Sequence, residues 1–415
     1  MVKVLRLENT RWGVSTSKAE DVDKILEFDP ANGVLSVHTL STPKPIGFQS
    51  ADQDLLTFLH ETIGENLGSL DIKMIHNHPV LEAYSAPFKL YLDITSVCSL
   101  PCSFCLQSDR KSETTLPLTV IQKIAQELAQ LGIMYVKIGG GDPLLHPNFP
   151  EVLSTLRSAG CFLSLSTNSV SITPQIVELL ARHSVRVSVS IEGMRSVNDS
   201  QRGAGHFDKA LKALEMLQAA GINTLLRTTL LSQNLSEVPQ LVELAKNLRT
   251  KIKFAYCRPA GRAVSNQTII GKAERAAYLR TIDYLNSPDV IPHILLDEGM
   301  MISQPTETVP KLFRGRMCGA ANRSMHIDPA GKVSPCIFMG PTFTYGMVYY
   351  DGTIADFWRG LIGNKFQVMR DIRQPQECDG CERICKNECI ANRFYFWGKY
   401  DRQDPNCLYF APEEA

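Results

Sequence analysis

Between Lys89 and Cys257 the chain alternates six short apolar stretches with amphipathic ones, and this alternation constrains the fold more than any other feature. The stretches expected as strands are KLYLDIT (89–95), MYVKI (134–138), CFLSLST (161–167), VRVSVSI (185–191), INTLLRTTLL (222–231) and KIKFAYC (251–257). Strands separated by helices pair in parallel through right-handed crossovers. Six units are two short of a closed eight-stranded barrel, so the sequence predicts an α/β fold with a partial, TIM-like (β/α)6 barrel.

The stretches between these strands have the spacing of helices with one apolar face. Two of them show it clearly, at Ile121, Ile124, Leu128 and Leu131 and at Phe207, Ala210, Leu211, Leu214 and Leu217. Thr119 and Gln122 predict a capping box at the start of the first helix, and Gly132 predicts its end. These apolar faces are expected to be hydrophobic core.

The two ends of the chain do not follow this pattern, so we predict three domains. Residues 1–85 contain short β-favouring runs, a turn signal at 29–33 and one helical pattern at 52–65, which predicts a small α+β domain. With seven Lys/Arg and twelve Asp/Glu, this segment has a net charge of −5. Residues 86–309 would form the partial barrel and a bridging segment, and residues 310–415 a cysteine-rich domain.

The overall composition excludes several function classes. Of the 415 residues, 44% are hydrophobic and 21% charged, which is an ordinary globular balance. Lys+Arg and Asp+Glu both number 43, so a strongly cationic nucleic-acid binder is not expected. No apolar run reaches the roughly 18 residues of a membrane span, and the N-terminus lacks the features of a signal peptide. We therefore expect a cytoplasmic protein without nucleic-acid or membrane partners.

Ten of the twelve cysteines lie in two groups, and clustered cysteines in a cytosolic protein indicate metal binding. The first group is Cys98, Cys102 and Cys105, in C-x3-C-x2-C spacing directly after the first predicted strand. Barrel enzymes carry their active sites at this end of the strands. A zinc ion or a [4Fe–4S] cluster normally takes four such ligands, so three thiolates leave one coordination site open for chemistry. A structural zinc site completed from elsewhere is the alternative.

These features resemble the radical S-adenosylmethionine (SAM) superfamily over about residues 89–260. C-x3-C-x2-C is the cluster loop of that superfamily, and Phe104 stands at its usual aromatic position. The resemblance implies that the three cysteines bind a catalytic [4Fe–4S] cluster whose open iron is chelated by SAM. Reductive cleavage of SAM would then give a 5′-deoxyadenosyl radical, which abstracts a hydrogen atom from the substrate. The protein would position the reactants and exclude water.

The resemblance also assigns SAM contacts to residues at the strand ends, namely Gly140, Gly141, Asp142, Ser166, Asn168, Ser190 and Arg202. Asp142 stands where the superfamily has the glutamate of a Gly-Gly-Glu motif that holds the SAM ammonium, and it is one methylene shorter. Ser190 and Arg202 resemble the pair that binds the SAM carboxylate, for which the forked arginine side chain is suited. The segment at 258–263 resembles one that lies near the site.

The second group comprises seven cysteines, Cys318, Cys336, Cys378, Cys381, Cys385, Cys389 and Cys407. Their spacing resembles the SPASM extension of peptide-modifying radical SAM enzymes, which usually carries two auxiliary [4Fe–4S] clusters, so that three clusters are expected in all. The resemblance assigns Cys378, Cys381, Cys385 and Cys407 to an outer cluster. Cys318, Cys336 and Cys389 would hold an inner cluster whose fourth iron is open or has a non-cysteine ligand. Two structural zinc sites are the alternative.

The resemblance as a whole implies a maturase of ribosomally made peptides, which forms a crosslink, a thioether or an epimer, or excises backbone atoms. A radical SAM enzyme of small-molecule cofactor or porphyrin biosynthesis is a second hypothesis. An iron–sulfur electron carrier is a third, and the residues around Ser190 and Arg202 argue against it. Expected partners are a precursor peptide and an electron donor such as flavodoxin or ferredoxin. The leader of the peptide would be recognised by residues 1–85 or by a separate protein.

Overall fold

The computed structural model describes four strands near the N-terminus and most of the chain beyond residue 85. The described ranges are 2–7, 11–16, 24–29, 34–39, 86–87, 89–106, 113–133, 135–266, 269–296, 318–340, 343–372, 375–378 and 389–405. Among the helices in these ranges, none is long and apolar enough to cross a membrane.

The N-terminal strands form a sheet of their own. The four strands β1 (Val2–Leu7), β2 (Arg11–Thr16), β3 (Lys24–Asp29) and β4 (Val34–Thr39) pair in chain order, each antiparallel to the next. β3 and β4 pair on either side of the turn signal predicted at 29–33, and residues 30–33 lie outside the described residues. The helix predicted at 52–65 lies outside the described residues.

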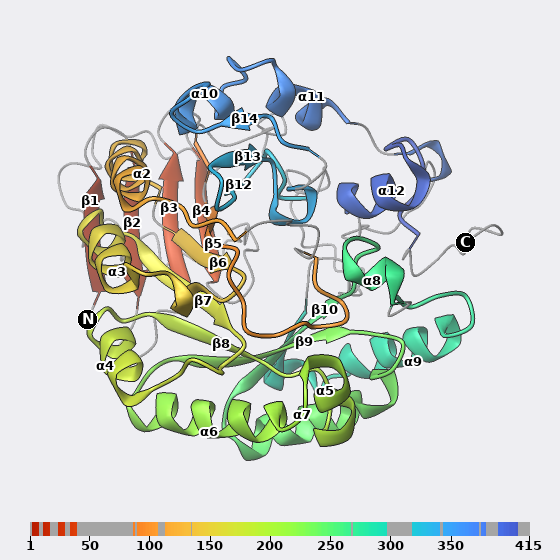
Figure 1. The fold of residues 1–415 in the computed structure, drawn as a ribbon. Coiled ribbons are helices and arrows are strands. Elements are labelled where there is room, and N and C mark those ends of the chain that lie inside the picture. The colour runs from red at the N-terminus through yellow and green to blue at the C-terminus, as the bar shows by residue number, and fades with distance from the viewer. Residues whose placement is uncertain are drawn as a thin grey trace.

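Six parallel strands form the partial barrel (Figure 1). They are β5 (Lys89–Thr95), β6 (Tyr135–Gly140), β7 (Phe162–Thr167), β8 (Arg186–Ser190), β9 (Thr224–Leu230) and β10 (Lys251–Tyr256). Each strand lies beside the next one in chain order. The α/β prediction is confirmed, and every strand begins and ends within two residues of its predicted range.

The sheet extends past the barrel at both edges to a total of ten strands. β11 (Ile294–Leu296) runs parallel to β10, and β12 (Ser324–Ile327) runs parallel to β5. β13 (Lys332–Ser334) and β14 (Gly346–Met347) follow in antiparallel order. The first part of the cysteine-rich region therefore continues the barrel sheet. The domain boundary predicted near residue 310 lies outside the described residues.

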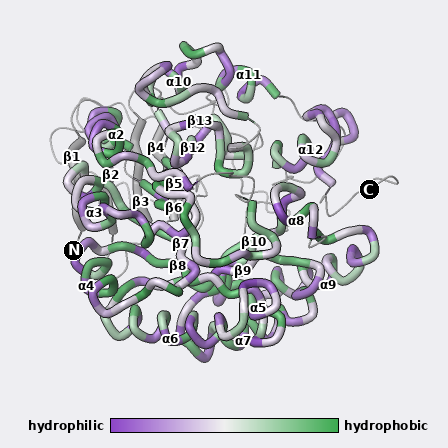
Figure 2. The backbone as a smooth tube through the Cα atoms, in the orientation of Figure 1, coloured by the Kyte–Doolittle hydropathy of each residue, from purple (hydrophilic) through white to green (hydrophobic). Residues whose placement is uncertain are grey.

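Most of the barrel helices cover the outer side of the curved sheet (Figure 1). The barrel helices are α2 (Leu118–Leu131), α3 (Phe149–Ser158), α4 (Pro174–Arg182), α5 (Arg195–Arg202), α6 (His206–Ala219), α7 (Val238–Asn247), α8 (Arg262–Ser265) and α9 (Arg275–Leu285). Short 3-10 helices are η3 (Pro143–Leu145), η4 (Leu235–Glu237) and η5 (Ile291–His293). Figure 2 shows hydrophobic and hydrophilic residues interleaved along these elements, as expected where one face is covered.

Helix α2 confirms one of its predicted ends and corrects the other. Gly132 caps its C-terminus in the left-handed conformation, at φ 66°, as predicted. At its start the N-cap is Pro117, and no side chain caps the helix, so the predicted capping box of Thr119 and Gln122 is wrong. Because Pro117 is extended and Leu118 is already helical, Thr119 lies inside the first turn.

The C-terminal region packs onto α2 through a buried carboxylate. Its helices are α10 (Ile354–Trp358), α11 (Lys365–Asp371) and α12 (Ile390–Trp397), with η8 (Ile337–Met339) and η9 (Gln376–Cys378). Glu127 of α2 accepts hydrogen bonds from the backbone N–H groups of Ile354 and Ala355 and from the Tyr349 hydroxyl. Helix α10 thus presents its N-terminus to a carboxylate, which favours this docking.

Candidate active site

The first three cysteines lie on the loop that follows β5, as predicted. Cys102 is buried, Cys105 is half-buried and Cys98 is exposed. Burial raises the pKa of Cys98 and of Cys102, and the charge of neighbouring thiols adds to both shifts. Arg202 opposes the shift at Cys102, and a hydrogen bond from Asn168 opposes it at Cys98. Three such thiolates at one place need further positive charge, which a metal cluster would provide.

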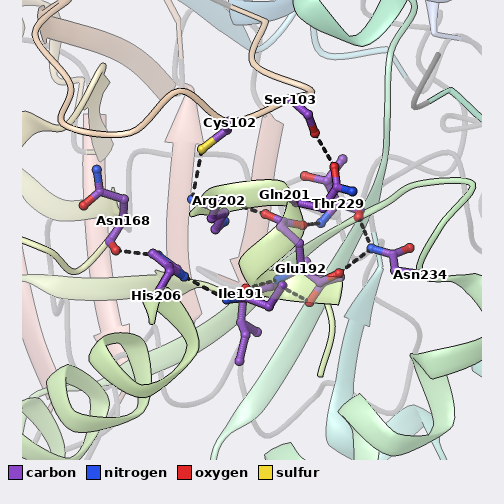
Figure 3. A network of polar contacts seen from close by, with 12 residues as sticks. Cys102, Ser103, Asn168, Ile191, Glu192, Gln201, Arg202, His206, Thr229 and Asn234 are labelled. Atoms are coloured by element: carbon purple, nitrogen blue, oxygen red, sulfur yellow. Dashed lines mark hydrogen bonds and ion pairs between the residues drawn. The ribbon is translucent and has the colours of Figure 1, made fainter. Parts of the chain in front are cut away.

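Other elements of the barrel hold this loop in place. The Ser103 N–H donates to the Gln201 carbonyl at 3.2 Å, and the two side chains also hydrogen-bond (Figure 3). The Arg262 N–H donates to the Cys105 carbonyl at 3.1 Å. Gly261 has a φ of +61°, and a Cβ there would lie 2.4 Å from the Cys105 oxygen, so only glycine fits. The segment at 258–263 therefore packs against the cluster loop.

Gly140 and Gly141 press against the stem of the same loop. A Cβ on Gly140, whose φ is +135°, would lie 2.0 Å from the Thr95 oxygen, and one on Gly141 would lie 2.2 Å from the Val97 oxygen. The Gly141 N–H donates to the Thr95 carbonyl at 2.7 Å. The glycines thus allow two backbones to meet closely and fix the stem from which the cysteines project.

Asp142 is fully buried, and both of its carboxylate oxygens accept hydrogen bonds from the protein. Oδ1 accepts from the Leu144 N–H at 3.1 Å, while Oδ2 accepts from the Thr167 hydroxyl at 2.8 Å and from the Asn168 N–H at 3.1 Å. Burial raises the pKa of Asp142, and these hydrogen bonds oppose the shift. The carboxylate therefore ties the end of β6 to the end of β7, and contact with the SAM ammonium stays a prediction.

The residues at the end of β7 include one that contacts the loop and two with unpartnered hydroxyls. Asn168 Nδ2 lies 3.5 Å from both Cys98 Sγ and the Ser99 hydroxyl. The hydroxyls of Ser166 and Ser169 are buried without a hydrogen-bond partner in the described structure. Such groups are costly unless a ligand completes them. Ser190, at the end of β8, is also buried.

Arg202 lies beside the loop but is paired with a carboxylate of the protein (Figure 3). Its guanidinium donates to Glu192 Oε1 at 2.5 Å and to Cys102 Sγ at 3.7 Å, while Nε is buried without a partner. Burial disfavours the charge, but Glu192 and the thiol of Cys102 outweigh it and raise the pKa of Arg202. The arginine thus stays charged at the loop and keeps one donor for a ligand.

Glu192 is the centre of a network that the sequence reasoning did not assign. Its Oε2 accepts from the Thr229 N–H at 2.5 Å, and its carbonyl accepts from Asn234 Nδ2 at 2.8 Å (Figure 3). Its N–H donates to Asn198 Oδ1 at 3.0 Å. A glutamate directly after a buried strand, within the run that contains Ser190, was the available signal.

His206 was also missed, and it supports Asn168 from below the loop. Its Nε2 lies 2.8 Å from the Asn168 carbonyl, and its Nδ1 lies 3.0 Å from Asn198 Nδ2. Burial and the charge of Arg202 lower the pKa of His206 to about 4. The imidazole is therefore neutral near pH 7, with Nε2 donating to the carbonyl and Nδ1 accepting.

In the C-terminal region, Cys318, Cys336 and Cys389 come together from three separate segments. Burial raises the pKa of Cys336, and the neighbouring thiols of Cys318 and Cys389 raise it further. Arg258, two residues after the end of β10, opposes the shift. The side chain of Cys378 and all of Cys381, Cys385 and Cys407 lie outside the described residues, so the outer cluster stays a prediction. Cys161 and Cys257 are buried core residues, as predicted.

A buried polar chain joins this second group to the barrel. His326 of β12 lies with Nε2 3.0 Å from Asp93 Oδ2 and with Nδ1 2.8 Å from the Ser334 hydroxyl. The Ser334 hydroxyl in turn donates to the Cys336 carbonyl at 3.2 Å. Strand β5, which leads into the first cysteine loop, is thereby connected to the segment of Cys336.

The described residues fit the cofactors implied by the sequence. Three thiols on one loop are the donors that iron–sulfur clusters take. The Ser166 hydroxyl and Arg202 Nε are buried without a hydrogen-bond partner, so they can bind a ligand. Within the described ranges, no three His, Cys, Asp or Glu side chains are spaced for a single metal ion. The fit therefore rests on donor chemistry and on these open polar atoms.

Two family models match the chain. The model of the radical SAM superfamily matches residues 92–245, and the model of the SPASM iron–sulfur cluster-binding domain matches residues 318–382. Mycofactocin maturase MftC of Mycobacterium ulcerans (strain Agy99) is 30% identical over 342 residues, which cover 80% of this chain and 90% of that protein. AdoMet-dependent heme synthase of Methanosarcina barkeri (strain Fusaro / DSM 804) is 27% identical over 350 residues, with coverages of 78% and 97%.

Among solved structures, Streptococcus suis SuiB bound to S-adenosylmethionine superposes with a TM-score of 0.65 at 16% identity. The superposition covers 95% of this chain and 99% of SuiB. SuiB bound to its precursor peptide SuiA superposes with a TM-score of 0.61. At this identity, the likeness concerns the fold, which extends over the barrel and the cysteine-rich region.

Proposed function

Because the chain belongs to the radical SAM superfamily and carries a SPASM domain, we propose that it is a maturase of a ribosomally made peptide. The modification would be a crosslink, a thioether, an epimerisation or an excision of backbone atoms. The observation that carries this proposal is the similarity to a mycofactocin maturase over 80% of the chain. That similarity is much longer than the radical SAM match at residues 92–245.

In the proposed function, Cys98, Cys102 and Cys105 hold the catalytic [4Fe–4S] cluster. SAM bound at the reduced cluster would supply a radical that abstracts a hydrogen atom from an unreactive C–H bond. Asn168 and Arg202 donate hydrogen bonds to the sulfurs of Cys98 and Cys102, and such donors help to set the reduction potential.

The SAM-binding residues in this proposal are those that the sequence reasoning assigned: Gly140, Gly141, Asp142, Ser166, Asn168, Ser190 and Arg202. The geometry divides their tasks. Gly140, Gly141 and Asp142 shape the loop and its neighbouring strand ends. Ser166 and Arg202 have polar atoms available to a ligand. Glu192 and His206 position Arg202 and Asn168, respectively.

The proposal includes two auxiliary clusters in the C-terminal domain. Cys318, Cys336 and Cys389 would hold the inner cluster, with one iron free for a substrate atom or another ligand. Cys378, Cys381, Cys385 and Cys407 would hold the outer cluster. The pairing of β12 with β5 and the contacts of His326 bring the segment of Cys336 close to the barrel, which suits electron transfer between the barrel and the inner cluster.

The proposed partners are a precursor peptide and an electron donor such as flavodoxin or ferredoxin. A peptide needs binding contacts away from the reacting residue to position the target C–H bond. We assign these contacts to the N-terminal domain (residues 1–85), with a separate recognition protein as the alternative. The barrel with its bridging segment (86–309) and the SPASM domain (310–415) would carry the chemistry.

The proposal is tested by incubating the anaerobically reconstituted enzyme with SAM, a reductant and short peptides encoded by neighbouring genes. Formation of 5′-deoxyadenosine together with a mass change of one peptide is the expected result. A variant lacking residues 1–80 should retain cluster content and uncoupled SAM cleavage but lose peptide modification. Modification at the normal rate by this variant would contradict the role of the N-terminal domain.

A second candidate function is the modification of a porphyrin. The observation in its favour is the 27% identity to an AdoMet-dependent heme synthase over 78% of this chain. The same assay with a porphyrin carboxylate in place of the peptide separates the two functions. Turnover of the porphyrin, with every candidate peptide unchanged, would replace the peptide proposal.

A further inference from the structure

The segment that follows β10 contacts both groups of thiols, and the proposed function leaves its arginine Arg258 without a task. Toward the first group, the Arg262 N–H donates to the Cys105 carbonyl at 3.1 Å. Toward the second group, the charge of Arg258 acts on the thiol of Cys336. Arg258 and Arg262 are four residues apart in the sequence, so a short stretch of chain joins the two sites.

Two aromatic rings hold the Arg258 side chain. Its guanidinium carbon lies 3.3 Å from the centroid of the Phe338 ring and 4.5 Å from the centroid of the Tyr256 ring. Tyr256 ends β10, whereas Phe338 lies in η8, two residues after Cys336. A cation stacked on aromatic rings is held in place and keeps its charge. Arg258 therefore connects the barrel to the segment of Cys336 and places a positive charge there.

The position of Phe338 is itself fixed by the C-terminal region. The Tyr395 hydroxyl of α12 donates to the Phe338 carbonyl at 2.8 Å. The next residue, Met339, is fully buried, and its N–H donates to the Cys336 carbonyl at 3.1 Å. The ring on which Arg258 stacks is thus part of the same turn that carries Cys336.

Electrostatics give this arrangement a consequence for the second thiol group. Burial and the thiols of Cys318 and Cys389 raise the pKa of Cys336, whereas Arg258 lowers it. A cluster held by these thiolates would become more negative by one charge on reduction. A nearby fixed cation favours the more negative state, and the net charge around an iron–sulfur cluster helps to set its potential.

We propose that Arg258, held between Tyr256 and Phe338, raises the reduction potential of the inner cluster, so that this cluster accepts an electron more readily. The inference rests on the inner cluster of the proposed function and does not depend on the identity of the substrate. It gives Arg258 a role in setting the redox properties of the second thiol group, in addition to its role in packing.

Three variants separate the charge of Arg258 from its packing. Arg258→Met removes the charge and keeps an unbranched side chain, Arg258→Lys keeps the charge, and Phe338→Leu keeps the charge and removes one ring. A purely structural role predicts that Arg258→Met and Phe338→Leu have equal effects on the potential. Arg195→Met is the matched control, because Arg195 is an exposed arginine whose guanidinium carbon lies 5.3 Å from the Phe207 ring centroid.

The measurement is a redox titration of the full-length, anaerobically reconstituted protein in which Cys98, Cys102 and Cys105 are replaced by alanine. Electron paramagnetic resonance then follows the auxiliary clusters, and the signal that Cys336→Ser removes belongs to the inner one. At a fixed potential, Arg258→Met should lower the ratio of reduced to oxidised inner cluster by about tenfold, which is a shift of about 59 mV to a more negative potential for a one-electron couple. The outer cluster should keep its potential.

The charge-conserving variants should behave like their parent. In Arg258→Lys, Phe338→Leu and Arg195→Met, the ratio should stay within about threefold of the parent value. If Arg258→Met does not assemble the inner cluster, Arg258→Gln is titrated in its place, with the same expected shift. An unchanged ratio in the variant without the charge would overturn the inference, as would an equal fall in Phe338→Leu.

The same titration separates this inference from the proposed function. A shift confined to the variant without the charge, in a protein that modifies no peptide, would support the role of Arg258 while the peptide function fails. Peptide modification with an inner potential that does not respond to Arg258→Met would leave the peptide function intact and overturn the inference. Absence of any signal that depends on Cys336 would overturn both the inference and the inner cluster.

Discussion

The two groups of thiols are built in contrasting ways. Cys98, Cys102 and Cys105 lie within one loop of eight residues at the end of a strand. Of the second group, Cys318 and Cys336 flank the hairpin of β12 and β13, and Cys389 lies near Cys336 although it is more than fifty residues further along the chain.

This difference indicates different tasks. Arg202 and Asn168 donate to thiols of the first group, and their own partners, Glu192 and His206, are buried. Among the described residues, the second group is linked to the barrel through the backbone of Cys336, by way of Ser334, His326 and Asp93. In the proposed function, the first group would therefore hold the reactive cluster, and the second would hold a cluster that accepts electrons or substrate atoms.

The largest expected effect comes from removing each group in turn. Replacing the three cysteines of the first group by alanine should remove about a third of roughly 12 iron atoms per chain and all 5′-deoxyadenosine formation. Replacing Cys318, Cys336 and Cys389 should remove another third, retain uncoupled SAM cleavage and abolish peptide modification. Iron analysis and product chromatography measure both. Equal loss of SAM cleavage in the two variants would erase the distinction between the groups.

The next largest effect concerns the ion pair that supports the first group. Arg202→Ala leaves Glu192 buried without its partner and should lower the free energy of unfolding by about 3–5 kcal/mol. The double variant Arg202→Met/Glu192→Leu should lose less than the single one, because no charge is stranded. Arg195→Ala, which removes an exposed pair with Asp208, is the control and should have no measurable effect.

Urea unfolding under anaerobic conditions measures these changes, and SAM binding is measured in parallel. Loss of a charged donor from Arg202 should weaken SAM binding by about 1.5–3 kcal/mol. Unchanged SAM affinity in Arg202→Ala would show that the arginine serves only Glu192 and the loop. Asp142→Ala should weaken SAM binding by less than Arg202→Ala does, because it acts indirectly, through loss of the link between β6 and β7.

A smaller effect is a pH dependence that comes from His206. Its pKa is lowered to about 4 in the folded protein, against about 6.5 in an unfolded chain. As the pH falls from 6.5 toward 4, the unfolded state binds a proton that the folded state does not. Stability should therefore fall by at most about 1.4 kcal/mol per pH unit from this group. His206→Gln should flatten this slope between pH 7 and pH 5.5 in urea unfolding, and an unchanged slope would contradict this origin.

The smallest expected effect is on the reduction potential of the first cluster. Asn168→Ala removes a donor to Cys98, so the potential should become more negative by an amount on the order of tens of millivolts. Asn266→Ala is the matched control, because Asn266 donates to the Ser103 carbonyl at 2.8 Å and not to a sulfur. Redox titration followed by electron paramagnetic resonance compares them. Equal shifts in both variants would indicate a general loosening of the loop.

The contrast between the groups also explains which features the sequence could predict. The barrel strands and the first cysteine loop depend on local periodicity and spacing, so both were placed from the sequence. Strand β12 pairs with β5, and β13 and β14 follow it at the edge of the sheet. The pairing of β12 with β5 joins segments far apart in the sequence, and no local pattern predicted it. The partners of Asp142, Glu192 and His206 lie on other strands and loops, so their roles required the fold.

The same reasoning applies to the start of α2. Thr119 and Gln122 have the spacing of a capping box, but Pro117 starts the helix before them. A capping-box spacing can therefore occur by chance inside a helix whose first residue is fixed by a preceding proline. The cluster loop was a safer prediction, because three cysteines in its spacing have few other uses.

The central claim is that a hydrogen atom passes from a peptide to SAM-derived carbon at the first cluster. It is tested by supplying a precursor peptide deuterated at every carbon, Cα included, and analysing 5′-deoxyadenosine by mass spectrometry. We predict that deuterium appears in 5′-deoxyadenosine with the wild-type enzyme. Modified peptide accompanied by 5′-deoxyadenosine that contains no deuterium would contradict the claim.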